Sequence, residues 1–231
     1  MKVACCILSY NITKGMKSFG PIGMLKKNQK SKELILLQIE NIRRIFGSAD
    51  IYLITGFGSD KIHKLVENKK YVKIIENDQF ATKNYGYSLK LFLHNIESKI
   101  DDYQGFFFID SNILITNLLN KKKNKSWIVC KKNTKTAKKT EDFIGFNNID
   151  ETISYMFYNL GDYSWCNSFY LSKNDIKKVI TYKDYYYDNM FLFEILNLAI
   201  EKFDLKLFPN LTKTQKDVIN IKGLKDKNKI K

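Results

Sequence analysis

The chain has 231 residues, 44% of them hydrophobic, and a formal net charge of +15 at neutral pH. This length and hydrophobic content exclude a wholly disordered chain and provide for one large domain with a sizeable core. No apolar run reaches the roughly 18 residues that a membrane-spanning helix needs. The positive charge favours anionic partners such as nucleotides, nucleic acid or acidic proteins, although a coding bias toward lysine would produce the same excess.

The first half of the chain alternates between predicted strands and helices. Short apolar runs predict strands at 3–8, 51–55, 71–75 and 106–109. Apolar residues at helical spacing predict helices around 34–46, 59–66 and 86–96, with Ser31 and Ser59 as N-caps and Gly47 as a stop. This alternation predicts an α/β fold with a mostly parallel, Rossmann-like central sheet flanked by helices.

The second half predicts a smaller antiparallel part. We expect short strands at 143–146 and 155–158, a strand at 164–171, a helix capped by Ser172, and helical structure over 188–203. We expect residues 1–211 to form a single domain and the lysine-rich residues 212–231 to form a flexible tail.

The region Lys121–Lys139 is dense in lysine and contains the apolar run Trp127–Val129. It is a candidate surface for a nucleic-acid backbone or an acidic protein, and a solvated charged hairpin is the simpler interpretation.

The cysteines give no sign of a disulfide framework or a zinc site. Cys5 and Cys6 are adjacent inside the first apolar run, and Cys130 and Cys166 lie far away in the sequence. This spacing predicts a reduced, cytoplasmic protein. The apolar start of the chain is too short for a signal peptide.

The segment Gly105–Asn112 carries the most informative chemical signal. A buried strand runs directly into Asp110, and open α/β sheets bind their ligands at the carboxyl ends of the strands. Asp110 is therefore a candidate metal ligand, and the alternative is an aspartate that closes a turn after the strand.

Five short motifs follow one another along the chain. They are Gln38–Ile42, Ile54–Phe57 with Asp60–Ile62, Asn77–Phe80 with Asn84 and Tyr87–Leu89, Phe108–Leu114, and Tyr187-Asp188. In this order and spacing they resemble the sugar-phosphate and choline-phosphate nucleotidyltransferases, a family with a glycosyltransferase-A-like α/β fold. The resemblance spans roughly residues 3 to 209. It implies an enzyme that transfers a nucleotidyl group from a nucleoside triphosphate to a phosphorylated small acceptor with the help of Mg²⁺.

The resemblance implies that Asp110, Asn112 and Asp188 hold the metal, with Asp110 also acting in catalysis. Asn112 stands where the family has an acid. An amide oxygen can bind a hard cation but adds no charge. Asp188 has a simpler interpretation as the N-cap of the helix that follows it.

The resemblance also implies that Lys17 and Lys26 steady the phosphates and that Gly15, Asn84 and Ser88 contact the nucleotide. The family's loop after the first strand reads GxGxR…PK, and the paired glycines are missing here. Gly15 would replace the turn, and Lys17 would bring a point charge instead of an arginine fork. The two lysines have a simpler interpretation as solvated surface residues.

Two further functional interpretations stay open at this point. The missing glycines and Asn112 favour a catalytically degenerate member of the fold that acts as a binding or assembly protein. A nucleotide-sugar glycosyltransferase is the third alternative, because donor diphosphates need a similar metal site.

Overall fold

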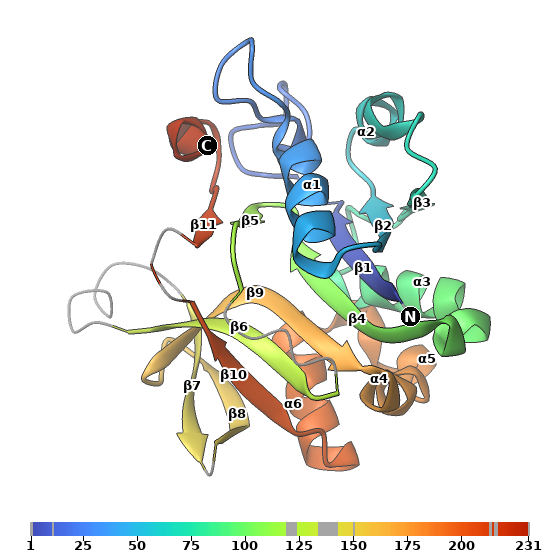
Figure 1. The fold of residues 1–231 in the computed structure, drawn as a ribbon, viewed down its shortest axis with the longest axis vertical. Helices are drawn as coiled ribbons and strands as arrows, with labels where there is room; N and C mark the ends of the chain where they lie inside the picture. Colours follow the sequence, from blue (N-terminus) through green and yellow to red (C-terminus); the bar gives the residue numbers. More distant parts are fainter. Residues whose placement is uncertain are drawn as a thin grey trace.

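The protein is described by a computed structural model that covers residues 2–10, 12–118, 124–133, 143–149, 151–212, 214 and 217–230 (Figure 1). A large sheet runs through the molecule, with helices on both of its faces. Its strands follow the order β10-β6-β9-β4-β1-β2-β3, and the hairpin of β7 and β8 is attached through β9. The bounds of these strands are β1 Lys2–Ser9, β2 Asp50–Thr55, β3 Val72–Glu76, β4 Tyr103–Asp110, β6 Ser126–Lys132, β7 Ile144–Ile149, β8 Thr152–Tyr158, β9 Tyr163–Ser172 and β10 Leu207–Leu211.

The sheet is mainly parallel, as the sequence predicted. Strands β4, β1, β2 and β3 run parallel to one another, and β10 is parallel to β6. Strand β9 lies antiparallel between β4 and β6, and the β7–β8 hairpin is antiparallel. Figure 1 shows this hairpin at the end of the molecule far from β2 and β3. The predicted fold class is confirmed.

The helices are α1 Leu34–Phe46, α2 Ser59–Val66, α3 Tyr85–Ile96, α4 Lys173–Ile180, α5 Lys183–Tyr186 and α6 Leu192–Phe203. Short 3-10 helices are η1 Ile22–Met24, η2 Glu97–Asp102, η4 Tyr187–Asn189 and η5 Leu224–Lys229.

Two hydrophobic cores cover the two faces of the sheet. Alternate residues of β1 enter different cores: Val3, Cys5 and Ile7 pack with α1 and α2, whereas Ala4, Cys6 and Leu8 pack with α3, α4 and α6. Successive side chains of a strand point to opposite faces. A strand that is buried on both faces therefore needs a continuous apolar run, which explains the first strand of the sequence.

Several predicted helix ends are confirmed and others are wrong. Gly47 closes α1 with φ of 76°, and Ser172 caps α4 by accepting a hydrogen bond from the Asp175 amide. Ser31 instead bonds Asn28, and α1 begins after Glu33. Ser59 is the first residue of α2 and follows Gly58, whose left-handed φ of 65° suits glycine.

The C-terminal end differs from the flexible tail that we expected. Strand β11 (Val218–Asn220) pairs with β5 (Ile113–Ile115) to form a separate two-stranded sheet, and η5 follows it. Ile221 and Ile230 are both 0% exposed. The lysine content of this segment masked three well-spaced apolar residues, Val218, Ile221 and Ile230, that attach it to the domain.

Within the described part of the chain, no helix has the length and apolar character required to cross a lipid bilayer.

Candidate active site

The candidate site residues lie at the carboxyl ends of the parallel strands. Strands β1 and β4 are in register, with Leu8 opposite Asp110, and the Ser111 amide donates to the Leu8 carbonyl at 3.0 Å. The turn after β4 therefore lies beside the start of the β1–α1 loop, which we define as residues 12–33. Parallel strands point their carboxyl ends to one edge, and ligands of open α/β sheets bind there.

Two cavities meet at this edge. The smaller one has a volume of about 400 Å³ and is lined by Tyr10, Ile12, Thr13, Ile22, Asn84, Tyr85, Asp110, Ser111, Asn112 and Phe191. The larger one is a cleft of about 1040 Å³ that extends toward the β7–β8 hairpin and the C-terminal strand. Tyr85, Asp110 and Phe191 line both cavities, so Asp110 stands at their junction.

The Asp110 carboxyl is held in one orientation. It is 6% exposed, and the Tyr85 hydroxyl donates to its Oδ2 at 2.7 Å. Burial raises the pKa of Asp110 to about 6, and hydrogen bonds from Tyr85 and from the Asn112 and Ser111 amides only partly oppose this effect. The group is therefore mostly ionised at neutral pH and has a strong preference for a nearby cation.

Tyr85 and Tyr10 form an aromatic wall beside Asp110. Their rings meet edge to face, with centroids 5.2 Å apart. Tyr85 is the first residue of α3, and Tyr10 follows β1 directly. Neither residue was among the predicted site residues. The position of Tyr85 between Asn84 and Ser88 was a usable signal, whereas nothing local in the sequence indicated Phe191.

The turn after β4 is fixed from two sides. The buried Gln38 side chain on α1 donates from Nε2 to the Asp110 carbonyl at 2.8 Å and also to the Ile113 carbonyl. On the other side, the Asn112 carbonyl accepts a hydrogen bond from the Ile221 amide at 2.8 Å. Buried polar groups that are bonded in this way restrict the turn to one conformation.

Asn112 has one polar atom without a partner. Its Oδ1 is buried and accepts no hydrogen bond from any described residue, although a buried acceptor is costly to leave unsatisfied. Asp110 and Asn112 line the same small cavity. Hard oxygen donors of this kind fit Mg²⁺, which takes one or two protein ligands and completes its shell with water and phosphate oxygens.

Asp188 does not join this pair. Its carboxylate lies 3.2 Å from Lys83 Nζ and 3.4 Å from Lys90 Nζ. Its slight burial raises the pKa, but hydrogen bonds and charges from the two lysines outweigh that effect and hold the pKa of Asp188 below its usual value. Asp188 lines neither of the two cavities, and the described residues contain no group of three acidic, histidine or cysteine side chains able to hold a metal. It also does not cap α6, which begins after Phe191.

The two predicted nucleotide contacts on α3 have different surroundings. Asn84 lines the smaller cavity, and its side chain donates to the Asn189 carbonyl at 2.7 Å. Ser88 is 0% exposed and accepts a hydrogen bond from Asn77 Nδ2 at 2.9 Å. This burial does not support the predicted contact of Ser88 with a nucleotide and indicates that Ser88 orders the β3–α3 connection.

The predicted nucleotide contact Gly15 and the predicted phosphate-binding residues Lys17 and Lys26 lie in the β1–α1 loop but line neither of the two cavities. Gly15 has φ of 80° in a turn, with open space around it. Lys17 is exposed, and Lys26 Nζ lies 2.7 Å from Glu33 Oε1. The loop residues that do line the smaller cavity are Ile12, Thr13 and Ile22.

The lysine-dense region is only partly described, because residues 119–123 and 134–142 lie outside the described residues. Trp127 is 3% exposed and belongs to the core, so it is not displayed for stacking with bases. Lys131 and Lys132 line the larger cleft. The described part of this region therefore contributes to the cleft.

Known proteins that are similar to this chain have solved structures of the same kind of fold. No protein-family model and no curated protein sequence matches the chain. Among solved structures, it is similar to the CTP:phosphocholine cytidylyltransferase of Streptococcus pneumoniae, with a TM-score of 0.73, 18% identity, and coverage of 100% of this chain and 98% of that chain. The nucleoside-diphosphate-sugar pyrophosphorylase of Vibrio cholerae gives a TM-score of 0.73 at 11% identity, covering 96% and 97% of the two chains.

The inositol-1-phosphate CTP transferase of T. maritima is also similar, with a TM-score of 0.66, 14% identity, and coverage of 90% of this chain and 84% of that chain. The chain has a nucleotidyltransferase-like fold. The resemblance that its motifs indicated is confirmed at the level of structure. Identities this low establish the fold and leave the activity to be argued from the site.

Proposed function

We propose that the protein is a nucleotidyltransferase that transfers a nucleotidyl group from a nucleoside triphosphate to a phosphorylated small acceptor. The observation that carries this proposal is the buried Asp110 carboxylate at the junction of two cavities, in a chain with a nucleotidyltransferase-like fold. The smaller cavity would take the phosphates of the nucleotide, and the larger cleft would take the acceptor.

The proposed reaction is a displacement at the α-phosphorus. A phosphate oxygen of the acceptor forms a bond to this phosphorus, the bond to the oxygen bridging the α- and β-phosphates breaks, and pyrophosphate leaves with the electron pair. Such a transfer depends on alignment and on neutralisation of charge more than on covalent help from the protein. Two adjoining cavities provide the alignment, because they hold the two substrates on either side of one carboxylate.

The residues of the junction have separate roles in this proposal. Asp110 and Asn112 would hold Mg²⁺, which supplies charge neutralisation for the phosphates when bound. Tyr85 holds the Asp110 carboxylate in place through its 2.7 Å hydrogen bond. Lys17 and Lys26 would act from the loop by adding positive potential near the triphosphate.

The larger cleft suits a small anion with an apolar or ring-shaped body. Lys131, Lys132 and Lys222 lie along it and provide positive charge. Phe191 and Phe193 stack with centroids 6.1 Å apart, and Phe193 also contacts Tyr158. Two proteins of similar fold act on phosphocholine and on inositol-1-phosphate, according to their names. Phosphorylated amino alcohols, polyols and sugars are therefore the acceptors to test first.

Calorimetric titration tests the nucleotide half of the proposal. The four nucleoside triphosphates are titrated with and without Mg²⁺ into the wild type, Asp110→Asn and Asp101→Asn. The last variant is the matched control, because Asp101 is an exposed carboxylate paired with Lys173 and Lys177. We expect Mg²⁺-dependent binding that Asp110→Asn abolishes and Asp101→Asn preserves. Absence of binding to all four nucleotides would refute the proposal.

Release of pyrophosphate tests the transfer itself. The nucleotide that binds is incubated with a panel of phosphorylated sugars, polyols and amino alcohols, and product is identified by mass spectrometry. We expect turnover with one class of acceptor and none with the unphosphorylated compounds.

A catalytically degenerate binding protein is the second candidate. Two observations favour it: Asn112 brings no charge to the site, and the Asp188 carboxylate is already paired with two lysines. This candidate predicts nucleotide binding without turnover for every acceptor of the panel.

A further inference from the structure

The C-terminal segment, residues 217–230, is bonded to the turn that carries the candidate site. The Asp217 carbonyl accepts from the Thr116 amide at 2.8 Å, and the Ile221 amide donates to the Asn112 carbonyl at 2.8 Å. Between these two bonds, β11 pairs with β5 over Ile113–Ile115. The chain therefore returns, more than a hundred residues later, to fix the turn directly after Asp110.

The same segment packs against the β1–α1 loop. Ile221 and Ile230 share one apolar cluster with Met16, Ile22 and Leu25 of the loop, together with Leu34 and Leu114. Met16, Leu34, Ile221 and Ile230 are each 0% exposed. This cluster is separate from the two large cores of the sheet, so the loop and the C-terminal segment bury each other's apolar side chains.

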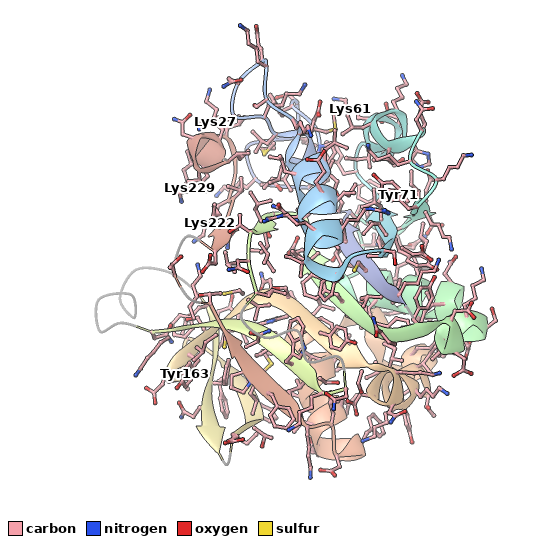
Figure 2. All side chains as sticks on the ribbon, viewed as in Figure 1. Lys27, Lys61, Tyr71, Tyr163, Lys222 and Lys229 are labelled. Carbon is pink, nitrogen blue, oxygen red and sulfur yellow. The ribbon has the colours of Figure 1, made fainter. Side chains whose placement is uncertain are left out.

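A glycine supplies an unusual backbone conformation where the C-terminal segment passes the loop. Gly223 has φ of 149° and ψ of −164°, a conformation that is essentially restricted to glycine. A Cβ atom at this position would lie 4.0 Å from the Lys14 carbonyl, next to the turn at Gly15. Figure 2 shows Lys222 and Lys229 on the same side of the molecule as Lys27 of the loop.

The segment also forms part of the larger cleft. Val218, Asn220 and Lys222 line it, and the Val218 carbonyl accepts a hydrogen bond from Lys131 Nζ at 2.8 Å. One short stretch thus contacts the Asn112 turn, the β1–α1 loop and the cleft wall.

We propose that the C-terminal segment is a brace that orders the β1–α1 loop and the Asn112 turn, so that nucleotide affinity depends on its docking. The proposal rests on the proposed function for its ligand, a nucleoside triphosphate. The physical reason is that a loop held mainly by turns and one short 3-10 helix must be ordered before it can hold phosphates. The brace lowers the entropy cost of that ordering. By linkage, bound nucleotide stabilises the docked brace by the same factor.

The test compares variants of the full chain. Ile221→Ala with Ile230→Ala removes the apolar contacts, Ile221→Val with Ile230→Val is the conservative pair, and Leu224→Ala is the control. Leu224 belongs to the same segment but is 43% exposed. Hydrogen exchange followed by mass spectrometry reports the order of residues 12–33 and of β1–β4. Calorimetry with each nucleoside triphosphate and Mg²⁺ reports affinity.

We expect the alanine pair to speed exchange in residues 12–33 and to weaken nucleotide binding by about tenfold or more, within the usual range of coupling between sites. Exchange in β1 and β4 should stay unchanged, and the valine pair should lie between the alanine pair and the wild type. Saturating nucleotide should slow tryptic cleavage after Lys225 and Lys227 in the wild type.

Unchanged exchange in residues 12–33 would overturn the brace. Equal loss of protection in β1 and β4 would also overturn it, because the segment would then be a general determinant of folding; if the alanine pair unfolds, the valine pair is judged by the same criterion. If the wild type binds no nucleotide, the proposed function fails, and the exchange measurement still decides whether the segment orders the loop.

Discussion

Replacing Asp110 by asparagine should stabilise the fold at neutral pH while it abolishes binding of Mg²⁺ and nucleotide. The carboxyl is 6% exposed, and burial raises its pKa from the ordinary 3.8 to about 6. Because the pKa is higher in the folded state than in the unfolded state, the folded protein binds the proton more tightly. The stabilisation that comes from proton binding at Asp110 is therefore fully present at low pH, and it is lost as the pH rises from about 4 to about 6.

The size of the change in the free energy of unfolding follows from the pKa shift of Asp110. Each pKa unit corresponds to about 1.4 kcal/mol, so the ionised carboxylate costs at most about 3 kcal/mol of stability at neutral pH. Asparagine has no charge to bury at any pH. The difference in the free energy of unfolding between Asp110→Asn and the wild type should therefore grow by about 2 to 3 kcal/mol between about pH 4 and about pH 7.5.

Urea unfolding of both proteins across this pH range measures the difference, and the titration of all other groups cancels in the comparison. Asp101→Asn is the control of opposite sign, because hydrogen bonds from Lys173 and Lys177 hold the pKa of Asp101 below its usual value. A difference between wild type and Asp110→Asn that does not change with pH would refute the reasoning. If the buried charge of Asp110 serves to bind a cation, Asp110→Asn should raise the free energy of unfolding at neutral pH and abolish ligand binding.

Three further substitutions separate the roles of neighbouring residues. Tyr85→Phe removes a hydrogen bond that lowers the pKa of Asp110, so the acid side of the pH profile for nucleotide binding, measured by calorimetry, should move to higher pH. Asn112→Asp adds a carboxylate next to Asp110, and electron paramagnetic resonance should show Mn²⁺ affinity about tenfold higher or more. Ser88→Ala leaves the buried Asn77 Nδ2 without its acceptor and should lower the free energy of unfolding by about 1 to 3 kcal/mol, with nucleotide affinity within about twofold of the wild type.

Each of these expectations has a contrary result. If the pH profile of nucleotide binding does not move in Tyr85→Phe, the hydrogen bond from Tyr85 does not influence the titration of Asp110 that controls binding. Unchanged Mn²⁺ affinity in Asn112→Asp would place the cation elsewhere. A Ser88→Ala protein of normal stability that binds nucleotide weakly would restore Ser88 as a nucleotide contact.

Local sequence signals were sufficient for the parallel half of the fold. The run Val3–Leu8 indicated a strand buried on both faces, and the alternation of strands and helices indicated crossovers between parallel strands. Strands β5, β6, β10 and β11 were not predicted as strands. Two of them are only three residues long, and β6 lies in a lysine-dense region where polar composition outweighed its buried residues.

The site was predictable only in part. Asp110 was identified because it directly follows a predicted buried strand, whereas Asn112 was identified because the resemblance places it where the family has an acid. Both residues line the smaller cavity. The ion pairs that hold Asp188 with Lys83 and Lys90 could not be predicted, because they connect two segments about a hundred residues apart. The burial of Ser88 likewise depends on how α3 packs beside Asn77.

The sequence by itself determined that a buried strand ends in an acid, since the period of the side chains and the position of Asp110 are local properties. The tertiary structure alone decided what surrounds that acid. Tyr85 reaches it from the start of α3, Gln38 fixes its turn from α1, and Ile221 fixes Asn112 from the C-terminal segment. These contacts join residues that are far apart in the chain, so they form only when the sheet brings the ends of its strands to one edge.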